Sequence, residues 1–154
     1  MKIAEKKITV ADEPDFLHLL GGTNVITRPM HSEFDIIALS EEGITKASVD
    51  ILMSYLDISK KAFAEDILQL SVKTMERKKD TDKLDSRTSS HIIEIAKVVE
   101  HALDVFEDKD KVKLWFNAPN RALNNMKPIQ LFSNYTGLNM VNTILGRIEY
   151  GIFS

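Results

Sequence analysis

Residues 91–106 read HIIEIAKVVEHALDVF, and this stretch decides the fold. Its apolar residues recur every three or four positions along one stripe, at Ile92, Ile95, Val99, Ala102 and Phe106. Residues with this spacing lie on one face of an α-helix. The stretch is therefore predicted to form one long amphipathic helix.

Shorter helices are predicted on both sides of this stretch, and the fold class that we expect is all-α. Three apolar-periodic stretches begin after hydroxyl residues that can accept hydrogen bonds from the N–H groups of a first helical turn, namely Thr45, Ser59 and Ser71. Pro128 suits the first position of a short helix, because the N–H that proline lacks has no partner there. Asn134 is a candidate N-cap for the last helix.

The apolar pattern divides the chain into three parts. Residues 1–33 give a weak signal and are interpreted as an N-terminal arm of uncertain order, and 34–107 form a helical bundle. The charged run EDKDK interrupts the pattern, so 108–154 are interpreted as a second, small helical domain. Within the bundle, the polar stretch 80–90 (DTDKLDSRTSS) is expected to be a linker.

Composition excludes several classes of protein. The 20 basic and 23 acidic residues give a net charge of −3, which argues against indiscriminate binding of polyanions by the whole surface but not against a local basic face. There is no cysteine, so the chain has no disulfide, no thiol nucleophile and no thiolate metal site. Without a long apolar segment or a secretory signal, we expect a cytoplasmic protein that does not enter a membrane.

Residues 59–79 have the layout of a helix-turn-helix, in which the second helix enters the major groove of DNA. In that second helix, Val72 and Met75 can face the core. The candidate DNA-binding residues are Lys60, Lys61, Ser71, Lys73, Thr74, Arg77 and Lys78. Their lysine and arginine side chains can neutralise phosphates, and arginine can also bind guanine. The alternative is a solvated, charged helix in an ordinary bundle.

Catalytic chemistry is not expected. His91 with Glu94, or His101 with Asp104, can share a helix face, but neither pair forms a set of three or four metal ligands. The serines stand at helix caps, and no phosphate-binding glycine loop is present. We therefore expect no enzyme activity, no metal site and no cofactor.

Three C-terminal stretches resemble the toxin-binding domain of the Xre/MbcA/ParS antitoxins. They read LWFNAPNRAL (114–123), KPIQLF (127–132) and GLNMVNTILGRIEYGIFS (137–154). Upstream, FAEDILQLSVKTMER (63–77) resembles the core of the Xre-type helix-turn-helix of that family. The resemblance extends from about Met30 to the last residue, and 1–29 lie outside it.

The resemblance implies an antitoxin of a type II toxin–antitoxin system. Its partner would be a RES-domain toxin, an enzyme that consumes or uses NAD, and the antitoxin would occlude its active site with the C-terminal end. The residues that the resemblance assigns to toxin binding are Asn120, Arg121, Arg147, Glu149, Tyr150, Gly151, Ile152, Phe153 and Ser154. It also implies operator binding and autorepression. Because helix-turn-helix proteins read palindromic sites as dimers, we expect a homodimer.

Two departures from the family pattern affect the local structure. The stretch between Ala64 and Ser71 is one residue longer than usual, and Gln69 stands where a turn glycine is often found. Lys127 replaces the usual serine or threonine before Pro128, which removes one helix cap.

Two alternatives stay open at the level of the sequence. Ile152 or Phe153 can pack against the last helix of its own chain instead of a toxin. The protein can also be a stand-alone transcriptional regulator whose C-terminal part only mediates dimerisation.

Overall fold

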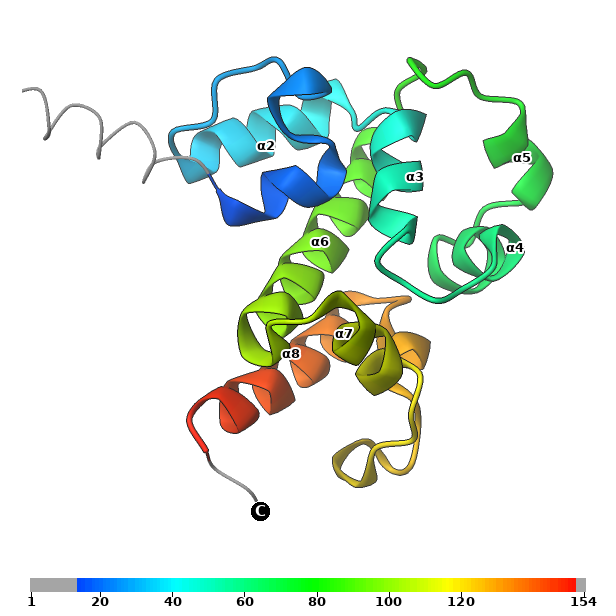
Figure 1. Cartoon of the computed structure of the whole chain (residues 1–154). Helices are drawn as coiled ribbons and strands as arrows, with labels where there is room; N and C mark the ends of the chain where they lie inside the picture. Colours follow the sequence, from blue (N-terminus) through cyan, green and yellow to red (C-terminus); the bar gives the residue numbers. More distant parts are fainter. Residues whose placement is uncertain (1–13, 152–154) are drawn as a thin grey trace, which may run out of the picture.

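The computed structural model describes residues 14–151 and confirms the all-α fold, because these residues form helices and short helical turns with no strand (Figure 1). In chain order the elements are η1 (Asp15–Leu20), η2 (Gly22–Asn24), α2 (Glu33–Glu42), α3 (Lys46–Met53), α4 (Lys60–Ala62), η3 (Phe63–Ile67), α5 (Val72–Glu76), α6 (Ser86–Phe106), α7 (Lys109–Phe116), η4 (Arg121–Leu123), η5 (Pro128–Leu131) and α8 (Tyr135–Glu149). The element η3 is a π-helix, and the other η elements are 3-10 helices.

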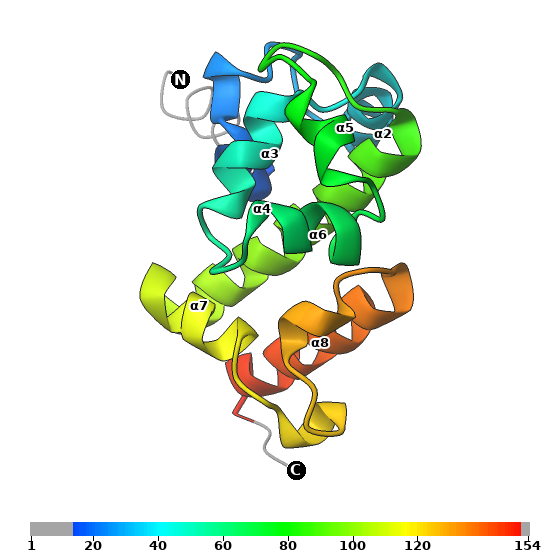
Figure 2. The same cartoon turned by 90° about the vertical axis from the view of Figure 1, so that its right-hand side faces the viewer.

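Helix α6, predicted from the sequence as a long amphipathic helix, runs through the centre of the molecule. It contacts α2, η1, α7 and α8, elements from both ends of the described chain (Figures 1 and 2). The predicted stripe is buried at Ile92, Ile95, Val99 and Ala102. Phe106, at the end of the stripe, is half-buried and stacks on Trp115 with 5.5 Å between ring centres.

The start of α6 corrects one expectation from the sequence. Residues 86–90 are helical and do not belong to a linker, because the Asp85 side chain accepts a hydrogen bond from the Thr88 N–H at 2.8 Å and begins the helix there. Ser89 is fully buried, and its hydroxyl oxygen accepts from the Ile44 N–H at 2.8 Å. The sequence predicted a solvated linker here because Ser89 is polar, but its hydroxyl binds backbone groups inside the core.

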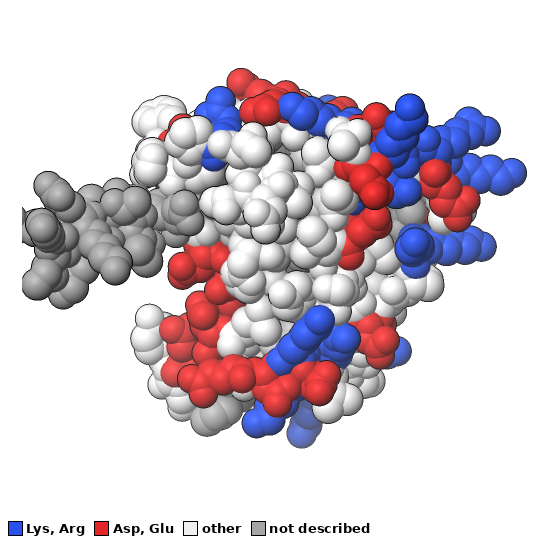
Figure 3. Space-filling view, turned by 45° about the horizontal axis from the view of Figure 1, so that its top comes forward, with Lys and Arg blue, Asp and Glu red and all other residues white. Residues whose placement is uncertain are grey.

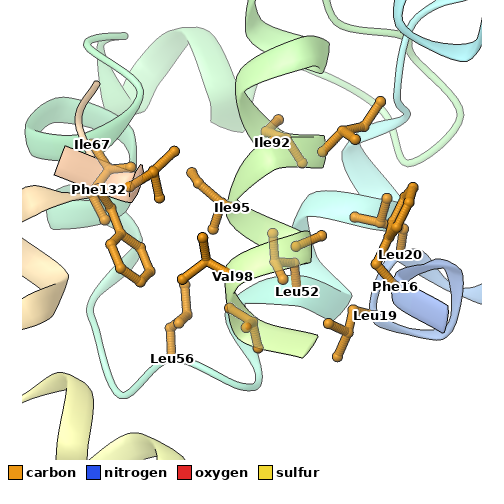
Figure 4. Packing of buried hydrophobic residues seen from close by; sticks show 14 of the residues in the cluster. Phe16, Leu19, Leu20, Leu52, Leu56, Ile67, Ile92, Ile95, Val98 and Phe132 are labelled. Atoms are coloured by element: carbon orange, nitrogen blue, oxygen red, sulfur yellow. The ribbon is translucent and has the colours of Figure 1, made fainter. Parts of the chain in front are cut away.

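Residues 14–30, which the sequence assigned to an arm, are part of the core. Phe16, Leu19 and Leu20 are buried on one side of α6, opposite Phe132 and Ile67 (Figure 4). The Leu20 carbonyl accepts a hydrogen bond from the buried Ser48 hydroxyl at 2.6 Å. This packing depends on contacts distant in sequence, so local periodicity did not reveal it. Residues 1–13 of the predicted arm lie outside the described residues.

The predicted helix caps are confirmed. Thr45, Ser59 and Ser71 each accept a hydrogen bond from the backbone N–H three residues later. Asn134 caps α8 through the Gly137 N–H at 2.8 Å. Pro128 is the first residue of η5. These caps fix where the helices begin and hence which side chains each helix presents.

The C-terminal half packs around an aromatic pair. Phe116 of α7 and Phe132 are both fully buried and meet edge to face, with 5.1 Å between ring centres. Helix α8 passes close to η5 at Gly137, where the Cβ of any other residue would overlap the Leu131 carbonyl oxygen. The buried residues of both halves form one cluster, and the division of the chain at residues 33 and 107 stays a prediction. None of the helices described is long and apolar enough to span a bilayer.

Candidate functional site

The C-terminal helix α8 separates a buried face from an exposed one. Leu138, Val141 and Leu145 face the core. On the other side, Arg147 is exposed, and the Tyr150 side chain beyond the helix end is 77% exposed. The helix therefore presents a cation and an aromatic ring on the surface that leads to the end of the chain.

A groove with a volume of about 190 Å³ lies beside Arg147, between α8 and the η4 loop. Its walls combine apolar side chains with uncharged polar groups and a single cation. The lining residues are Ala122, Leu123, Asn139, Met140, Thr143, Ile144 and Arg147. A surface of this composition suits an apolar side chain of a partner together with a carboxylate or phosphate near Arg147.

The η4 loop is held by its own hydrogen bonds. The Asn120 side chain accepts from the Ala122 N–H at 2.9 Å, and the Asn120 backbone pairs with Met126. Asn124 and Asn125 follow with φ values of 60° and 63°, a left-handed conformation that asparagine tolerates. Asn120 therefore shapes the loop, while the neighbouring Arg121 is exposed.

At the end of α8, Glu149 is bound to the central helix. Its Oε2 lies 2.7 Å from His101 Nε2, and the Asn142 side-chain oxygen lies 2.6 Å from His101 Nδ1. The family resemblance assigns Glu149 to toxin binding, and the sequence predicts no role for His101. The two residues are distant in sequence, so no local signal connects them. The bridge fixes the last turn of α8 on α6.

The remaining predicted toxin-binding residues lie at or beyond the end of this helix. Gly151 has φ 71°, a left-handed conformation that favours glycine and turns the chain away from the helix. Ile152, Phe153 and Ser154 lie outside the described residues.

The predicted helix-turn-helix contains a π-helix that accounts for its extra residue. In η3, the Leu68 N–H donates to the Phe63 carbonyl five residues earlier at 3.0 Å. A π-turn accommodates one residue more than an α-turn does, which matches the one-residue excess between Ala64 and Ser71. Gln69 follows with φ 57°, so it adopts the left-handed conformation that a turn glycine would otherwise supply.

The second helix of the motif, α5, is short. It spans Val72–Glu76, and as predicted Met75 is buried and Val72 packs against the core. Lys73 and Thr74 are exposed on the outer side. Arg77 and Lys78 follow the end of the helix, so the predicted extension of the helix through 79 is corrected. The Lys46 ammonium group donates to the Lys78 carbonyl at 3.1 Å, just beyond the end of the helix.

The charges around this motif are mixed. Figure 3 shows Lys and Arg side chains projecting together at the end of the molecule where α5 lies, with acidic side chains among them. Lys60 is exposed, and Lys61 lies 4.0 Å from the Glu65 carboxylate. The Ser71 hydroxyl accepts from the Thr74 N–H at 3.1 Å, which caps α5, and lies 2.7 Å from the Thr74 hydroxyl, while its contact with DNA stays a prediction.

A larger groove, with a volume of about 410 Å³, separates the helix-turn-helix from the start of α8. Gln69 lies on one wall, and Ser133 and Tyr135 lie on the other. Partial burial, followed by the nearby Glu94 carboxylate, raises the pKa of the Tyr135 hydroxyl above its usual value. His91, also in the wall, binds the Phe132 carbonyl at 2.7 Å, which is a structural role. Residues 14–151 hold no group of three or more potential metal ligands.

Comparisons with known proteins agree with this geometry. Residues 101–151 match the family described as the antitoxin Xre/MbcA/ParS C-terminal toxin-binding domain. The protein named Antitoxin Xre from Photorhabdus laumondii subsp. laumondii is 29% identical over 131 residues, covering 82% of this chain and 86% of that protein. Antitoxin Xre from Yersinia enterocolitica serotype O:8 is 34% identical over 67 residues, covering 43% of this chain and 45% of that protein.

The match to the Photorhabdus protein is longer than the toxin-binding domain and so includes part of the upstream helices. The loop, the groove and the exposed side of α8 all lie within the matched domain. Residues 101–151 therefore match the antitoxin Xre/MbcA/ParS C-terminal toxin-binding domain, and the chain as a whole is similar to proteins named Antitoxin Xre.

Proposed function

We propose that this antitoxin neutralises a RES-type, NAD-dependent toxin by binding it directly and occluding its active site with residues 147–154. The antitoxin performs no reaction in this proposal and needs no cofactor. The sequence resemblance supports the toxin class, and the exposed end of α8 supports the mode of binding.

The observation that carries the proposal is the exposure of Tyr150 beside Arg147 at the end of a well-anchored helix. Tyr150 is 77% exposed, so its ring is not buried in the protein core. Large apolar surfaces are usually buried, either in a core or in an interface with a partner. The His101–Glu149 bridge holds the preceding turn, so a partner meets a preorganised surface. Arginine and tyrosine are also the residue types enriched among binding hot spots.

Deleting residues 150–154 tests this mode of inhibition. The deletion keeps Glu149 and its bridge to His101, so we expect the antitoxin to stay folded by circular dichroism. Co-expressed with the toxin, the truncated protein should fail to restore growth. Phe34→Ser is the matched control, because it removes an exposed aromatic residue from α2, at the other end of α6 (Figure 1). Full neutralisation by the truncated chain would reject occlusion by the tail.

We also propose that the antitoxin binds its operator as a homodimer in the cytoplasm and represses its own operon. Lys73 and Thr74 on the outer side of α5, with Lys60 at the start of α4, support this function. Helix α5 has only five residues, so base contacts are confined to one turn, and phosphate contacts should dominate the affinity.

Operator binding is tested with Lys73→Ala and Arg77→Ala, alone and combined, at several salt concentrations. Each substitution should weaken binding and reduce the salt dependence by about one counterion. Lys111→Ala on α7 is the control, because it removes an exposed lysine outside the motif. Unchanged affinity in the double variant would reject the assignment of the DNA-binding helix. DNA binding with no toxin partner in pull-downs would favour the stand-alone regulator.

A further inference from the structure

The groove between the η4 loop and α8 has an apolar floor and a polar rim. Leu123 and Ile144, at its floor, are 3% and 9% exposed. Met140 is 45% exposed, and Thr143 and Arg147 are exposed on the same side of α8, because residues three, four or seven positions apart share one face of a helix. The Thr143 hydroxyl donates to a backbone carbonyl of the preceding turn at 2.9 Å, so it needs no partner outside the helix. We call this site the η4–α8 groove.

The two elements that form the η4–α8 groove carry positive charge. Residues 117–151 contain a single acidic residue, Glu149, and three basic ones, Arg121, Lys127 and Arg147. Glu149 is engaged with His101 at 2.7 Å. Within residues 14–151, none of the three cations forms an ion pair. The acidic residues at the junction of α6 and α7 line no part of the groove. An occupant of the groove should therefore carry negative charge.

The volume of the η4–α8 groove limits what can occupy it. Sites for small molecules usually have about 300–1,000 Å³, whereas this groove has about 190 Å³. That space suits one side chain of another protein better than a free metabolite. The phosphate of a nucleic acid would pair with Arg147 but would leave the apolar floor at Leu123 and Ile144 without a partner. The best fit is therefore an apolar side chain with a carboxylate beside it.

The position of the η4–α8 groove indicates which protein fills it. All of its lining residues lie within 101–151, the part of the chain that matches the toxin-binding domain. Arg147 belongs both to the groove and to the exposed surface that leads to Tyr150. Pairing the groove with that of a second copy would bring the same cations together, which is repulsive. Continuity and charge both favour the toxin as the occupant.

We propose that the η4–α8 groove anchors the toxin and is separate from the tail that occludes the toxin's active site. One apolar side chain of the toxin packs over Leu123 and Ile144, and Arg147 binds a carboxylate next to that side chain. The inference rests on the proposed function, because the toxin is the occupant. It divides that function in two, since residues 139–147 hold the toxin and the residues from Tyr150 onwards block its active site.

Two substitutions of opposite charge at Thr143 test the anchor. Thr143→Glu places a carboxylate four residues before Arg147, where it pairs with the guanidinium and repels an acidic occupant. Thr143→Lys changes the size of the side chain similarly but adds a cation. Thr136→Glu, on an exposed position of α8 outside the groove, is the matched control. Circular dichroism checks that every full-length variant is folded.

Binding to the purified RES-type toxin encoded beside the antitoxin gene is measured by surface plasmon resonance. Thr143→Glu should weaken the affinity about tenfold or more, whereas Thr143→Lys and Thr136→Glu should leave it within about threefold. The chain without residues 150–154 should still bind the toxin, although it no longer neutralises it. This result would separate the anchor from the occluding tail.

The other outcomes of these measurements are decisive. Equal losses for Thr143→Glu and Thr143→Lys would overturn the acidic occupant. Unchanged affinity in Thr143→Glu, with binding lost on deletion of 150–154, would overturn the anchor and leave occlusion by the tail standing. If the unchanged full-length chain does not bind the toxin, the proposed function fails, and the anchor fails with it.

Photo-crosslinking identifies the occupant directly. The photoreactive residue p-benzoylphenylalanine is introduced in place of Met140 or, as a control, in place of the exposed Phe34 on α2. On irradiation of the complex, the position of Met140 should crosslink to a toxin peptide with Asp or Glu beside an apolar residue, and the position of Phe34 should give no toxin crosslink. An intact complex without a crosslink at the groove, or a crosslinked peptide that lacks an acidic residue, would overturn the proposal.

Discussion

The two halves of the molecule that flank α6 present their surfaces in different ways. The toxin-binding half relies on the fifteen-residue helix α8, capped by Asn134 and packed on buried aromatic rings. The helix-turn-helix half relies on α4, the π-helix η3 and α5, which have three, five and five residues. The left-handed residue Gln69 lies between η3 and α5. Helices this short are not stable alone, so they depend on tertiary contacts.

This difference in helix length indicates which of the two surfaces is held more rigidly. A long, capped helix keeps its exposed side chains in register, which favours tight binding of a protein partner. In the other half, the large side chains that hold the short helices on the core are Phe63, Ile67, Leu68 and Met75. We therefore expect damage to the C-terminal core to lower the stability of the whole fold, and damage to the turn to affect DNA binding first.

The largest expected effect comes from Phe132→Ala. Phe132 is fully buried and its ring meets Phe116 edge to face at 5.1 Å. Removing it leaves a cavity, so the free energy of unfolding should fall by about 3–5 kcal/mol. Urea denaturation monitored by circular dichroism measures the loss. Met75→Ala at the helix-turn-helix should cost less, about 2 kcal/mol; an equal or larger loss for Met75→Ala would remove the contrast between the halves.

Much of this contrast could be predicted from the sequence, because it rests on local signals. The caps at Ser59, Ser71 and Asn134 were predicted from residue type and position. The extra residue before Ser71 was noticed only against the family pattern. Its form as a π-helix was not predicted, because a hydrogen bond to the fifth preceding residue leaves no distinctive sequence pattern.

The turn itself provides the next largest effect. Gln69 has φ 57°, a conformation in which a β-branched side chain is strained. Gln69→Val should therefore destabilise the protein by about 1–2 kcal/mol, and Gln69→Gly should be neutral or slightly stabilising. Thermal unfolding measures stability, and operator affinity shows whether the helix-turn-helix is affected first. Comparable losses for the two substitutions would show that side-chain contacts, not backbone strain, decide this position.

Removing the Asp85 cap at the start of α6, the helix that both halves share, should have a smaller effect on stability, and one that depends on pH. The backbone N–H of Thr88 holds the pKa of the Asp85 carboxyl below its usual range, although partial burial opposes this shift. A lowered folded-state pKa stabilises the protein above the unfolded-state pKa, near pH 4, and this contribution is lost as the pH falls through the folded-state value. Asp85→Ala should cost about 1 kcal/mol at pH 7.

The difference between Asp85→Ala and the unchanged protein should narrow below pH 4. Denaturation curves at pH 7, 5 and 3 measure it. A constant difference across this range would mean that the cap acts without its charge.

The parts of the site that the sequence could not predict are contacts between distant residues. Glu149 was predicted to bind the toxin and no role was predicted for His101; only the packing of α8 on α6 brings their side chains to 2.7 Å. Likewise, Phe16 and Leu20 showed a short apolar run, but nothing local indicated that α6 would cover it. The predicted toxin-binding residues, such as Arg147 and Tyr150, were identified by resemblance to the family, and their roles in binding stay predictions.

The smallest expected effect on stability, and the most informative for the toxin surface, comes from His101→Ala. The His101 and Glu149 side chains are 22% and 43% exposed, so solvent screens their interaction and its loss should cost at most about 1 kcal/mol. Neutralisation should suffer more than stability, because the last turn of α8 is released just before Tyr150. Faster dissociation of the toxin complex in surface plasmon resonance would show this, with His101→Gln restoring part of the lifetime through one hydrogen bond. A dissociation rate unchanged in His101→Ala would mean that the tail binds without support from the bridge, and that α8 alone sets its direction.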